Sequence, residues 1–223
     1  MGLLRGPERA LKAKLTRITL DQFIRSHAST GRTLDIGAQT GPYAAFFPNR
    51  VALDLRPRPG IEIVGDAQAI GLAGGAFDVV LCTEVLEHLP EPQRAVDEMH
   101  RVLRPGGTLL LTTRFLFPIH DAPQDYFRFT KYGLRHLLRA FEIVELREET
   151  TTVGTLAVLI QRLGVQTHTR GGRFVRGMWL LAAQLARPFS GLSGQEFGDS
   201  RRTVPERGIM TTGYHVCATK ARC

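Results

Sequence analysis

The segment at residues 33–42, Thr-Leu-Asp-Ile-Gly-Ala-Gln-Thr-Gly-Pro, constrains the fold of this chain more than any other. Its apolar residues alternate with Asp35, which is typical of a buried strand, and a glycine turn follows directly. Gly37 and Gly41 permit a tight turn and a close approach of the backbone to a ligand, while Pro42 suits the first position of a helix. The segment therefore predicts a strand, a turn and a helix start that together bind a nucleotide.

A second acid closes the next apolar run. Residues 51–53, Val-Ala-Leu, are typical of a buried strand, and Asp54 follows them. Asp35 and Asp54 are two acids at strand ends. Their spacing suits a ribose that is held by its hydroxyl groups. The third glycine of the dinucleotide fingerprint is missing, and Gln39 stands inside the turn. A nicotinamide-dependent oxidoreductase on a similar sheet is therefore an alternative that the sequence disfavours.

Three more motifs follow in order along the chain. They are Ile-Glu-Ile-Val-Gly-Asp-Ala at residues 61–67, Phe-Asp-Val-Val-Leu-Cys-Thr-Glu-Val-Leu-Glu-His-Leu at 77–89, and Leu-Arg-Pro-Gly-Gly-Thr-Leu-Leu-Leu-Thr at 103–112. This succession resembles the class I S-adenosylmethionine-dependent methyltransferases. Within them it is similar to the methyltransferase type 11 branch, whose "EVLEHL" and "LRPGG" sequences quinone, sterol and natural-product methyltransferases share. The resemblance covers residues 31–150.

The alternation of strand and helix patterns predicts an α/β, doubly wound, mostly parallel sheet. We expect strands near residues 33–36, 50–54, 61–64, 77–82, 107–113, 141–146 and 213–220, and helices near 42–47, 67–72, 91–102 and 130–140. By the resemblance, the sheet is a seven-stranded Rossmann-like methyltransferase sheet, and its last strand inserts antiparallel beside the fifth after a helical insertion. The expected organisation is an N-terminal amphipathic helix within 1–30, a cofactor-binding core at 31–150, a basic helical insertion and loop at 151–207, and the final strand within 208–223.

The resemblance also implies S-adenosylmethionine as cofactor and assigns residues to it. The glycine turn would lie under its methionine part, Asp54 would bind the ribose, and Thr83 and Glu84 would form the wall of the methionine pocket. Asp66 and Ala67 would meet the adenine, because a carboxylate can accept its exocyclic amine. The assigned cofactor residues are Asp35, Gly37, Ala38, Gly41, Asp54, Leu55, Asp66, Ala67, Thr83 and Glu84.

The loop at residues 114–130 is the candidate for the chemistry, since ligands of such sheets bind outside the carboxyl ends of the strands. Methyl transfer to a hydroxyl requires alignment and removal of a proton. His120 is the candidate base, with Asp121 or Asp125 orienting it or the substrate; a structural role for this histidine is the alternative. The candidate substrate-binding residues are Arg114, Tyr126 and Arg128.

Neighbouring residues leave several alternatives open. Arg128 binds an anionic substrate group or pairs with Asp125, and Tyr126 belongs to an aromatic lid or an anchor for the next helix, whose N-cap we expect at Thr130. Glu87 and His88 are expected to shape a helix start, with His88 a weaker candidate base. The acid cluster of magnesium-dependent catechol O-methyltransferases is not recognisable, so no metal is predicted.

The net charge of +8 is unevenly distributed. Residues 1–30 carry 6 basic and 2 acidic groups, residues 31–169 carry 14 and 16, and residues 170–223 carry 9 and 3. Basic flanks suit nucleic acid, an anionic membrane or an acidic substrate, and equally a solvated surface. Residues 151–190 contain five arginines and no acid, and two helices broken at Gly171-Gly172 are expected there. They form an interfacial element on anionic lipid, a lid over the site or a dimer contact.

The three cysteines, Cys82, Cys217 and Cys223, lack metal-ligand spacing and indicate neither a disulfide framework nor a zinc site. Cys82 is expected to be a small apolar residue of a buried strand. No stretch has the length and apolarity of a membrane-spanning helix, and the first residues lack the apolar core of a secretory signal. The expected location is the cytoplasm, with the inner membrane face as an alternative.

The sequence therefore predicts an S-adenosylmethionine-dependent methyltransferase acting most naturally at oxygen. The expected acceptor is a small molecule, a sugar or glycan, or a lipid-linked compound, since similar "HxxPxDYxRxT" loops occur in family members that resemble glycan modifiers. A binding or membrane-docking protein without catalysis and an RNA methyltransferase remain alternatives. Methylation of DNA bases is disfavoured, because the aromatic signature expected after the fourth strand is replaced by Thr83-Glu84-Val85-Leu86.

Overall fold

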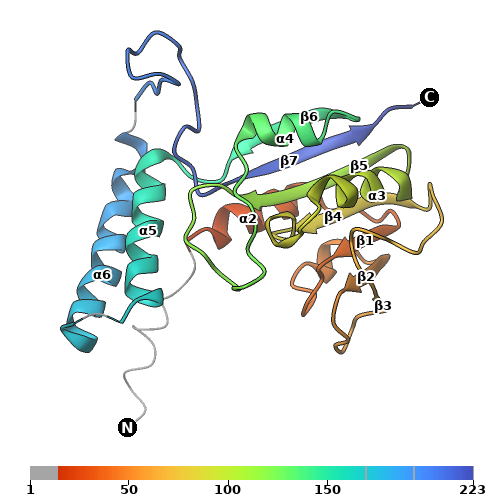
Figure 1. Ribbon diagram of the computed structural model, residues 1–223, viewed down its shortest axis with the longest axis horizontal. Helices are drawn as coiled ribbons and strands as arrows, with labels where there is room; N and C mark the ends of the chain where they lie inside the picture. Colours follow the sequence, from red (N-terminus) through yellow and green to blue (C-terminus); the bar gives the residue numbers. More distant parts are fainter. Residues whose placement is uncertain (1–14, 169, 193, 223) are drawn as a thin grey trace. The chain divides into compact units, whose positions relative to one another are not determined.

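A computed structural model describes residues 15–168, 170–192 and 194–222. The described chain divides into two compact units (Figure 1). The sheet unit contains residues 20–115, 119–147 and 213–222, and the helical unit contains residues 15–19, 116–118 and 148–212. The predicted site residues all lie in the sheet unit.

The sheet has seven strands in the order β3-β2-β1-β4-β5-β7-β6. Strands β1 to β5 pair in parallel, and β7 runs antiparallel to β5. The strands are β1 (Thr33–Ile36), β2 (Arg50–Asp54), β3 (Ile63–Val64), β4 (Phe77–Thr83), β5 (Leu103–Arg114), β6 (Phe141–Glu148) and β7 (Gly213–Lys220). The predicted α/β fold with an antiparallel last strand is confirmed.

Alternating side chains along each strand build two apolar layers, one on each face of the sheet. On β4, Val80 and Cys82 belong to the layer that contains Met99 of α3 (Pro92–Val102) and Leu134 of α4 (Lys131–Leu137). The intervening residues Val79 and Leu81 belong to the other layer, which contains Phe23 and Ile24 of α2 (Arg17–Ser26). Cys82 is fully buried as predicted, and burial raises the pKa of its thiol.

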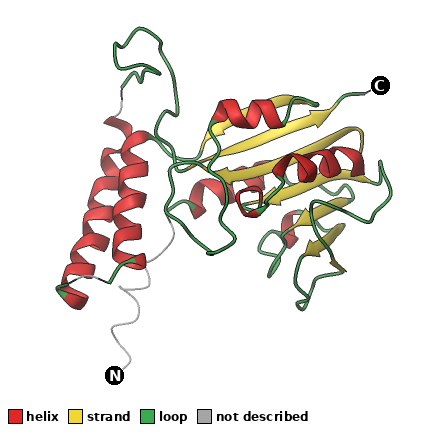
Figure 2. Cartoon of the chain, in the orientation of Figure 1, coloured by secondary structure: helices red, strands yellow, loops and turns green. Residues whose placement is uncertain are grey.

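Loops rather than helices join β2, β3 and β4 (Figure 2). The helices predicted near residues 42–47 and 67–72 are wrong: the first is a three-residue 3-10 turn, η1 (Ala44–Phe46), and the second is irregular. Pro48 limits the first segment, since the residue before a proline is disfavoured in a helix. Glycines at 71, 74 and 75 weaken the second, because each costs helix stability. The sheet therefore ends at the edge strand β3 with loops, residues 55–62 and 65–76, on either side of that strand.

The helical unit is built around two helices that pack side by side, α5 (Thr152–Gln166) and α6 (Gly172–Ala186) (Figure 1). The predicted helix pair with a break at Gly171-Gly172 is confirmed. A Cβ on Gly164 would lie 3.2 Å from Leu180 Cδ2, so this glycine permits the close approach of the helices. The amphipathic helix predicted within residues 1–30 is α2, from Arg17 onward; the part of the prediction that falls on residues 1–14 lies outside the described residues.

Helix α2 offers a matched pair of residues that tests its packing on the sheet. Ile24 is 0% exposed and Ile18 is 49% exposed on the same helix. We expect Ile24→Ala to lower the free energy of unfolding by about 2–5 kcal/mol, because it leaves a cavity in the core, whereas Ile18→Ala changes it by less than about 0.5 kcal/mol. Urea denaturation of both variants measures the difference. Equal losses would contradict the assigned face of α2.

Candidate active site

The carboxyl ends of four neighbouring strands bring the predicted cofactor residues to one edge of the sheet. Because β3, β2, β1 and β4 are adjacent and parallel, the loops that follow them lie in a row. Such an edge is where open α/β sheets bind ligands. Along the row stand Asp66 and Ala67 after β3, Asp54 and Leu55 at β2, Gly37, Ala38 and Gly41 after β1, and Thr83 and Glu84 at β4.

Asp54 links two of these loops through its carboxylate. Its Oδ2 accepts the backbone N–H of Gln39 at 3.0 Å, and its Oδ1 accepts that of Arg56 at 3.0 Å. Each oxygen retains a second lone pair for a ligand. A carboxylate held this way at a strand end is suited to the two hydroxyls of a ribose.

The glycine turn follows β1 in a conformation that side chains rarely adopt. Gly37 has φ +70° and Gly41 has φ +63°. A Cβ on Gly37 would lie 2.4 Å from Val85 Cγ2, and one on Gly41 would lie 2.9 Å from the Arg50 guanidinium. Gln39 also has a positive φ, +47°, and is exposed. The turn therefore needs glycine at both positions, for backbone conformation and for space.

Asp35 lies in the strand itself and forms a buried ion pair. Its Oδ2 accepts a hydrogen bond from Arg50 Nη1 at 2.8 Å. Burial raises the pKa of Asp35 to about 6, although the guanidinium beside it acts in the opposite direction. Since Arg50 also lies against Gly41, the pair supports the glycine turn from within the protein. Sequence analysis missed Arg50, which occupies the first position of β2.

The residues assigned to adenine lie beyond β3. Asp66 is exposed, and its Oδ1 accepts the backbone N–H of Gln68 at 2.8 Å, while Ala67 is buried. Leu55, at the end of β2, is 69% exposed. An exposed carboxylate, a buried small residue and an exposed apolar side chain together suit a planar base with a polar edge.

At the end of β4, Glu84 is paired with Arg114. Glu84 has φ +55°, and its Oε1 accepts a hydrogen bond from Nη2 of the almost fully buried Arg114. The structure thus joins a residue assigned to the cofactor with one assigned to the substrate. The guanidinium also brings positive charge to the strand-end edge.

The loop after β5 is fastened to η2 (Leu86–His88), the turn that follows β4. The backbone oxygen of Glu87 accepts the N–H groups of Tyr126 and Phe127 at 2.9 and 3.2 Å. His88 Nδ1 lies 2.5 Å from the backbone oxygen of Gln124. The predicted N-cap is confirmed, because Thr130 Oγ1 accepts the N–H of Gly133 at 3.0 Å and opens α4. These bonds hold the loop at the carboxyl end of β4.

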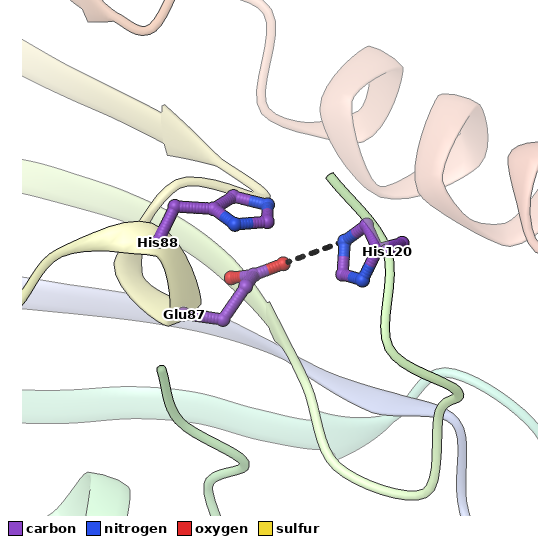
Figure 3. A group of neighbouring side chains, drawn as sticks. All are labelled: Glu87, His88 and His120. Carbon is purple, nitrogen blue, oxygen red and sulfur yellow. Dashed lines mark ion pairs between the residues drawn. The ribbon is translucent and has the colours of Figure 1, made fainter. Parts of the chain in front are cut away.

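The candidate base His120 lies between two carboxylates, and Figure 3 shows the one that belongs to Glu87. Its Nε2 is 3.9 Å from Glu87 Oε1, and its Nδ1 is 3.5 Å from Asp125 Oδ2. Its backbone N–H also donates to Asp125 Oδ2 at 2.8 Å. Burial lowers the pKa of His120 to about 4, while Asp125 acts in the opposite direction. An imidazole in this setting is neutral and able to accept a proton.

Asp125 is in turn held by Arg128. The guanidinium donates to both carboxylate oxygens, at 2.6 Å each, and this pairing lowers the pKa of Asp125 to about 2. Of the two roles considered for Arg128, the structure shows the pairing. Asp121 is exposed at φ +54°, and Tyr126 is 50% exposed.

Glu87 is the residue of this cluster that sequence analysis undervalued. Its side chain is fully buried, and burial raises its pKa to about 7. Its Oε2 accepts the hydroxyl of Thr113 at 2.7 Å. The signal available in the sequence was an acid in the first turn after a buried strand, next to a histidine.

Comparison with known proteins bears on this arrangement. Residues 34–111 match the family described as "Methyltransferase domain". The chain is 40% identical over 94 residues to a demethylmenaquinone methyltransferase of Renibacterium salmoninarum, covering 36% of this chain and 40% of that protein. Residues 34–111 therefore match a methyltransferase domain, in agreement with the resemblance to the class I S-adenosylmethionine-dependent methyltransferases.

Other proteins similar to this chain are also methyltransferases. A ubiquinone biosynthesis O-methyltransferase of Psychrobacter cryohalolentis is 40% identical over 68 residues, covering 30% of this chain and 24% of that protein. The chain thus spans less than half the length of these curated relatives. Among solved structures, a Burkholderia thailandensis 1,6-didemethyltoxoflavin-N1-methyltransferase with bound S-adenosylhomocysteine has a TM-score of 0.51 at 17% identity, covering 95% of this chain and 79% of that chain. It shows the same fold.

The buried Asp35 predicts a pH dependence of stability. Because its pKa is raised to about 6 in the folded state, folding takes up a proton at this group as the pH falls. Asp35 therefore adds up to roughly 3 kcal/mol of stability between pH 6 and pH 4, and this is lost as the pH rises again. We expect the unfolding free energy of the wild type to rise relative to that of Asp35→Asn as the pH falls from 6 to 4. Parallel pH profiles of the two proteins in urea denaturation would contradict this linkage to Asp35.

Proposed function

We propose that this methyltransferase binds S-adenosylmethionine at the ends of β3, β2, β1 and β4 and methylates an oxygen of a small acceptor. The observation that carries the proposal is the Asp54 carboxylate, held by two backbone N–H groups next to a turn that needs glycine. The bound S-adenosylhomocysteine of the Burkholderia thailandensis structural neighbour supports the choice of cofactor. The name of the Psychrobacter relative, an O-methyltransferase, supports oxygen as acceptor atom.

The residues at the strand ends fit this cofactor in kind and order. We assign the ribose hydroxyls to Asp54, the adenine to Asp66, Ala67 and Leu55, and the methionine part to the glycine turn with Thr83 and Glu84. Asp35 supports the turn through Arg50 and does so from a buried position. The chemistry that the cofactor supplies when bound is a methyl group on a positively charged sulfur.

In the proposed reaction, the protein aligns an acceptor hydroxyl with that methyl group and removes its proton. The carbon–sulfur bond breaks as the carbon–oxygen bond forms, and the sulfur keeps the electron pair. His120, neutral at ordinary pH, takes the acceptor proton, and Asp125 orients the ring and stabilises the resulting charge. Arg114, at the end of β5, and Tyr126, within the loop, would contact the acceptor. Asp121 is exposed, so we assign the orienting role to Asp125 in preference to Asp121.

The proposed acceptor is a small molecule, a sugar or glycan, or a lipid-linked compound bearing a hydroxyl. Its support is the composition of the loop after β5, which carries His120 and the exposed aromatic side chains of Tyr126 and Phe127. RNA is the less favoured acceptor, because the sheet unit's strand-end edge carries acids at 54, 66 and 84. A phosphate backbone needs a basic surface.

Asp54→Asn tests the cofactor assignment. Loss of a charged hydrogen-bond acceptor costs about 1.5–3 kcal/mol, so we expect the Kd for S-adenosylmethionine and S-adenosylhomocysteine to rise at least about tenfold in calorimetric titration. Asp97→Asn, the same change at an exposed helix position, is the control and should bind like the wild type. NAD and NADP should bind neither protein. Unchanged affinity in Asp54→Asn would remove Asp54 from the cofactor site.

We also propose that the helical unit docks on anionic lipid. Helix α6 buries Leu180 and Ala183 and exposes an apolar stripe at four-, three- and four-residue spacing, a helical period. No acid occurs between residues 151 and 195, while Arg170 and Arg173 are exposed. The stripe consists of Phe174, Met178, Leu181 and Leu185, each at least 51% exposed. Among the described residues, no helix has the length and apolarity needed to cross a membrane, so the contact would be peripheral.

Flotation with vesicles tests the docking. We expect the wild type to float with vesicles of phosphatidylglycerol and phosphatidylcholine, and less with phosphatidylcholine alone or at high salt. A Phe174→Ser, Leu185→Ser variant should stay in solution, while Val204→Ser, at an exposed position outside the helices, should float. Failure of the wild type to float would refute docking. A dimer that the double variant dissociates would show instead that a second copy covers the stripe.

A further inference from the structure

Three potential metal ligands gather where η2 meets the loop after β5. One ligand atom from each of Glu87, His88 and His120 lies within 4.8 Å of the other two. Figure 3 shows Glu87 and His88 projecting from the η2 turn and His120 from the separate loop segment facing it. The imidazoles of the two histidines are 4.8 Å apart between ring centroids. The fold thus converges two imidazoles and one carboxylate on one place.

Each of these side chains has an outer partner that orients it. Thr113 donates to Glu87 Oε2 at 2.7 Å and leaves Oε1 facing His120. The 2.5 Å contact of His88 Nδ1 with the Gln124 carbonyl is one that a donating N–H makes, so the lone pair of this ring is on Nε2. Asp125 lies on the Nδ1 side of His120, whose Nε2 faces Glu87. Carbonyl or carboxylate partners on the far nitrogen are the usual supports of metal-binding histidines.

The carboxylate of Glu87 supplies an independent observation. Its side chain is 0% exposed, and among the described residues its Oε1 has no hydrogen-bond partner. A buried carboxylate oxygen without a partner is costly, and the cost is offset when the oxygen pairs or coordinates a metal. We infer that Glu87, His88 and His120 bind one divalent transition-metal ion.

The ligand set selects the kind of ion. Two imidazoles and a carboxylate suit Zn²⁺, Fe²⁺, Co²⁺ or Ni²⁺, whereas Mg²⁺ and Ca²⁺ prefer oxygen ligands. Glu87 Oε1 and His120 Nε2 are 3.9 Å apart, which fits two ligands each about 2.0–2.2 Å from a common ion. The wider separations must close slightly on binding. Sequence spacing gave no sign of this site, because His120 lies on a different loop from Glu87 and His88.

The site would extend the proposed function, and this part of the inference rests on it. Three protein ligands leave coordination positions open to an oxygen of the acceptor. An ion there lowers the pKa of a bound hydroxyl, so that its proton leaves to water before the oxygen takes the methyl group. With the ion bound, His120 is a ligand, and proton removal no longer depends on its free ring nitrogen. The acceptor class is then a hydroxyl compound, such as a phenol or an enol, that can coordinate a metal.

The test of the site is a titration of the full chain, freed of metal beforehand, with Zn²⁺, Co²⁺ and Mg²⁺. We expect one Zn²⁺ or Co²⁺ per chain, with a visible Co²⁺ spectrum of nitrogen and oxygen ligation, and no comparable binding of Mg²⁺. Loss of a ligand should weaken binding more than the about 10–100-fold typical of losing an outer partner. Glu87→Gln, His88→Ala and His120→Ala should each show this loss. His136→Ala, at an exposed position on α4, is the control and should bind like the wild type.

The outcomes separate the metal site from the proposed function. If Glu87→Gln does not fold, the half-buried His88 carries the test, since the proposed function uses His120 as the base and gives His88 no role, whereas the metal site needs it. Unchanged Zn²⁺ binding in His88→Ala and His120→Ala, absent binding in the wild type, or a preference for Mg²⁺ would each overturn the inference. S-adenosylhomocysteine titration of the same variants reports on the cofactor site alone. If S-adenosylhomocysteine does not bind while Zn²⁺ binding is intact, the proposed function is refuted and the metal site is retained.

Discussion

The parallel pairing of β1 between β2 and β4 is the constraint on which the rest of the site depends. It places the glycine turn, Asp54 and the η2 turn at one edge of the sheet, although they are far apart in sequence. The loops after β2 and β3 lie at one end of this edge, and the loop after β5 lies at the other. Small changes in this pairing would separate the residues assigned to the cofactor from those assigned to the acceptor.

Local interactions explain why much of the fold was predictable. An apolar run that ends in an acid and a glycine turn specifies a strand end, and β1, β2 and β7 were predicted with their observed bounds. The N-cap at Thr130 depends on a hydroxyl and a helix pattern within a few residues, so it too was predictable. The helices predicted near 42–47 and 67–72 do not form. A proline and several glycines disfavour a helix there, and the apolar pattern is too short to stabilise one.

Interactions between distant segments explain what the sequence did not reveal. Arg50 pairs with Asp35 across neighbouring strands, and no spacing rule links the two. Glu87 and His120 come together only when the loop after β5 folds back on η2 (Figure 3). Arg128 was expected to bind either an anionic substrate group or Asp125, and in the folded loop it pairs with Asp125. The residues assigned to the cofactor are therefore recognisable from local sequence patterns, whereas those assigned to acid–base chemistry come together only in the tertiary structure.

A crystal structure of the protein with S-adenosylhomocysteine tests whether the cofactor binds at the ends of β3, β2, β1 and β4. We expect the ribose hydroxyls within hydrogen-bond distance of Asp54, the adenine against Ala67 and Leu55, and the sulfur directed toward the loop that carries His120. Glycine-turn atoms at Gly37 should lie against the methionine part. A ligand bound elsewhere, or no ligand at saturating concentration in crystals of the folded protein, would contradict it.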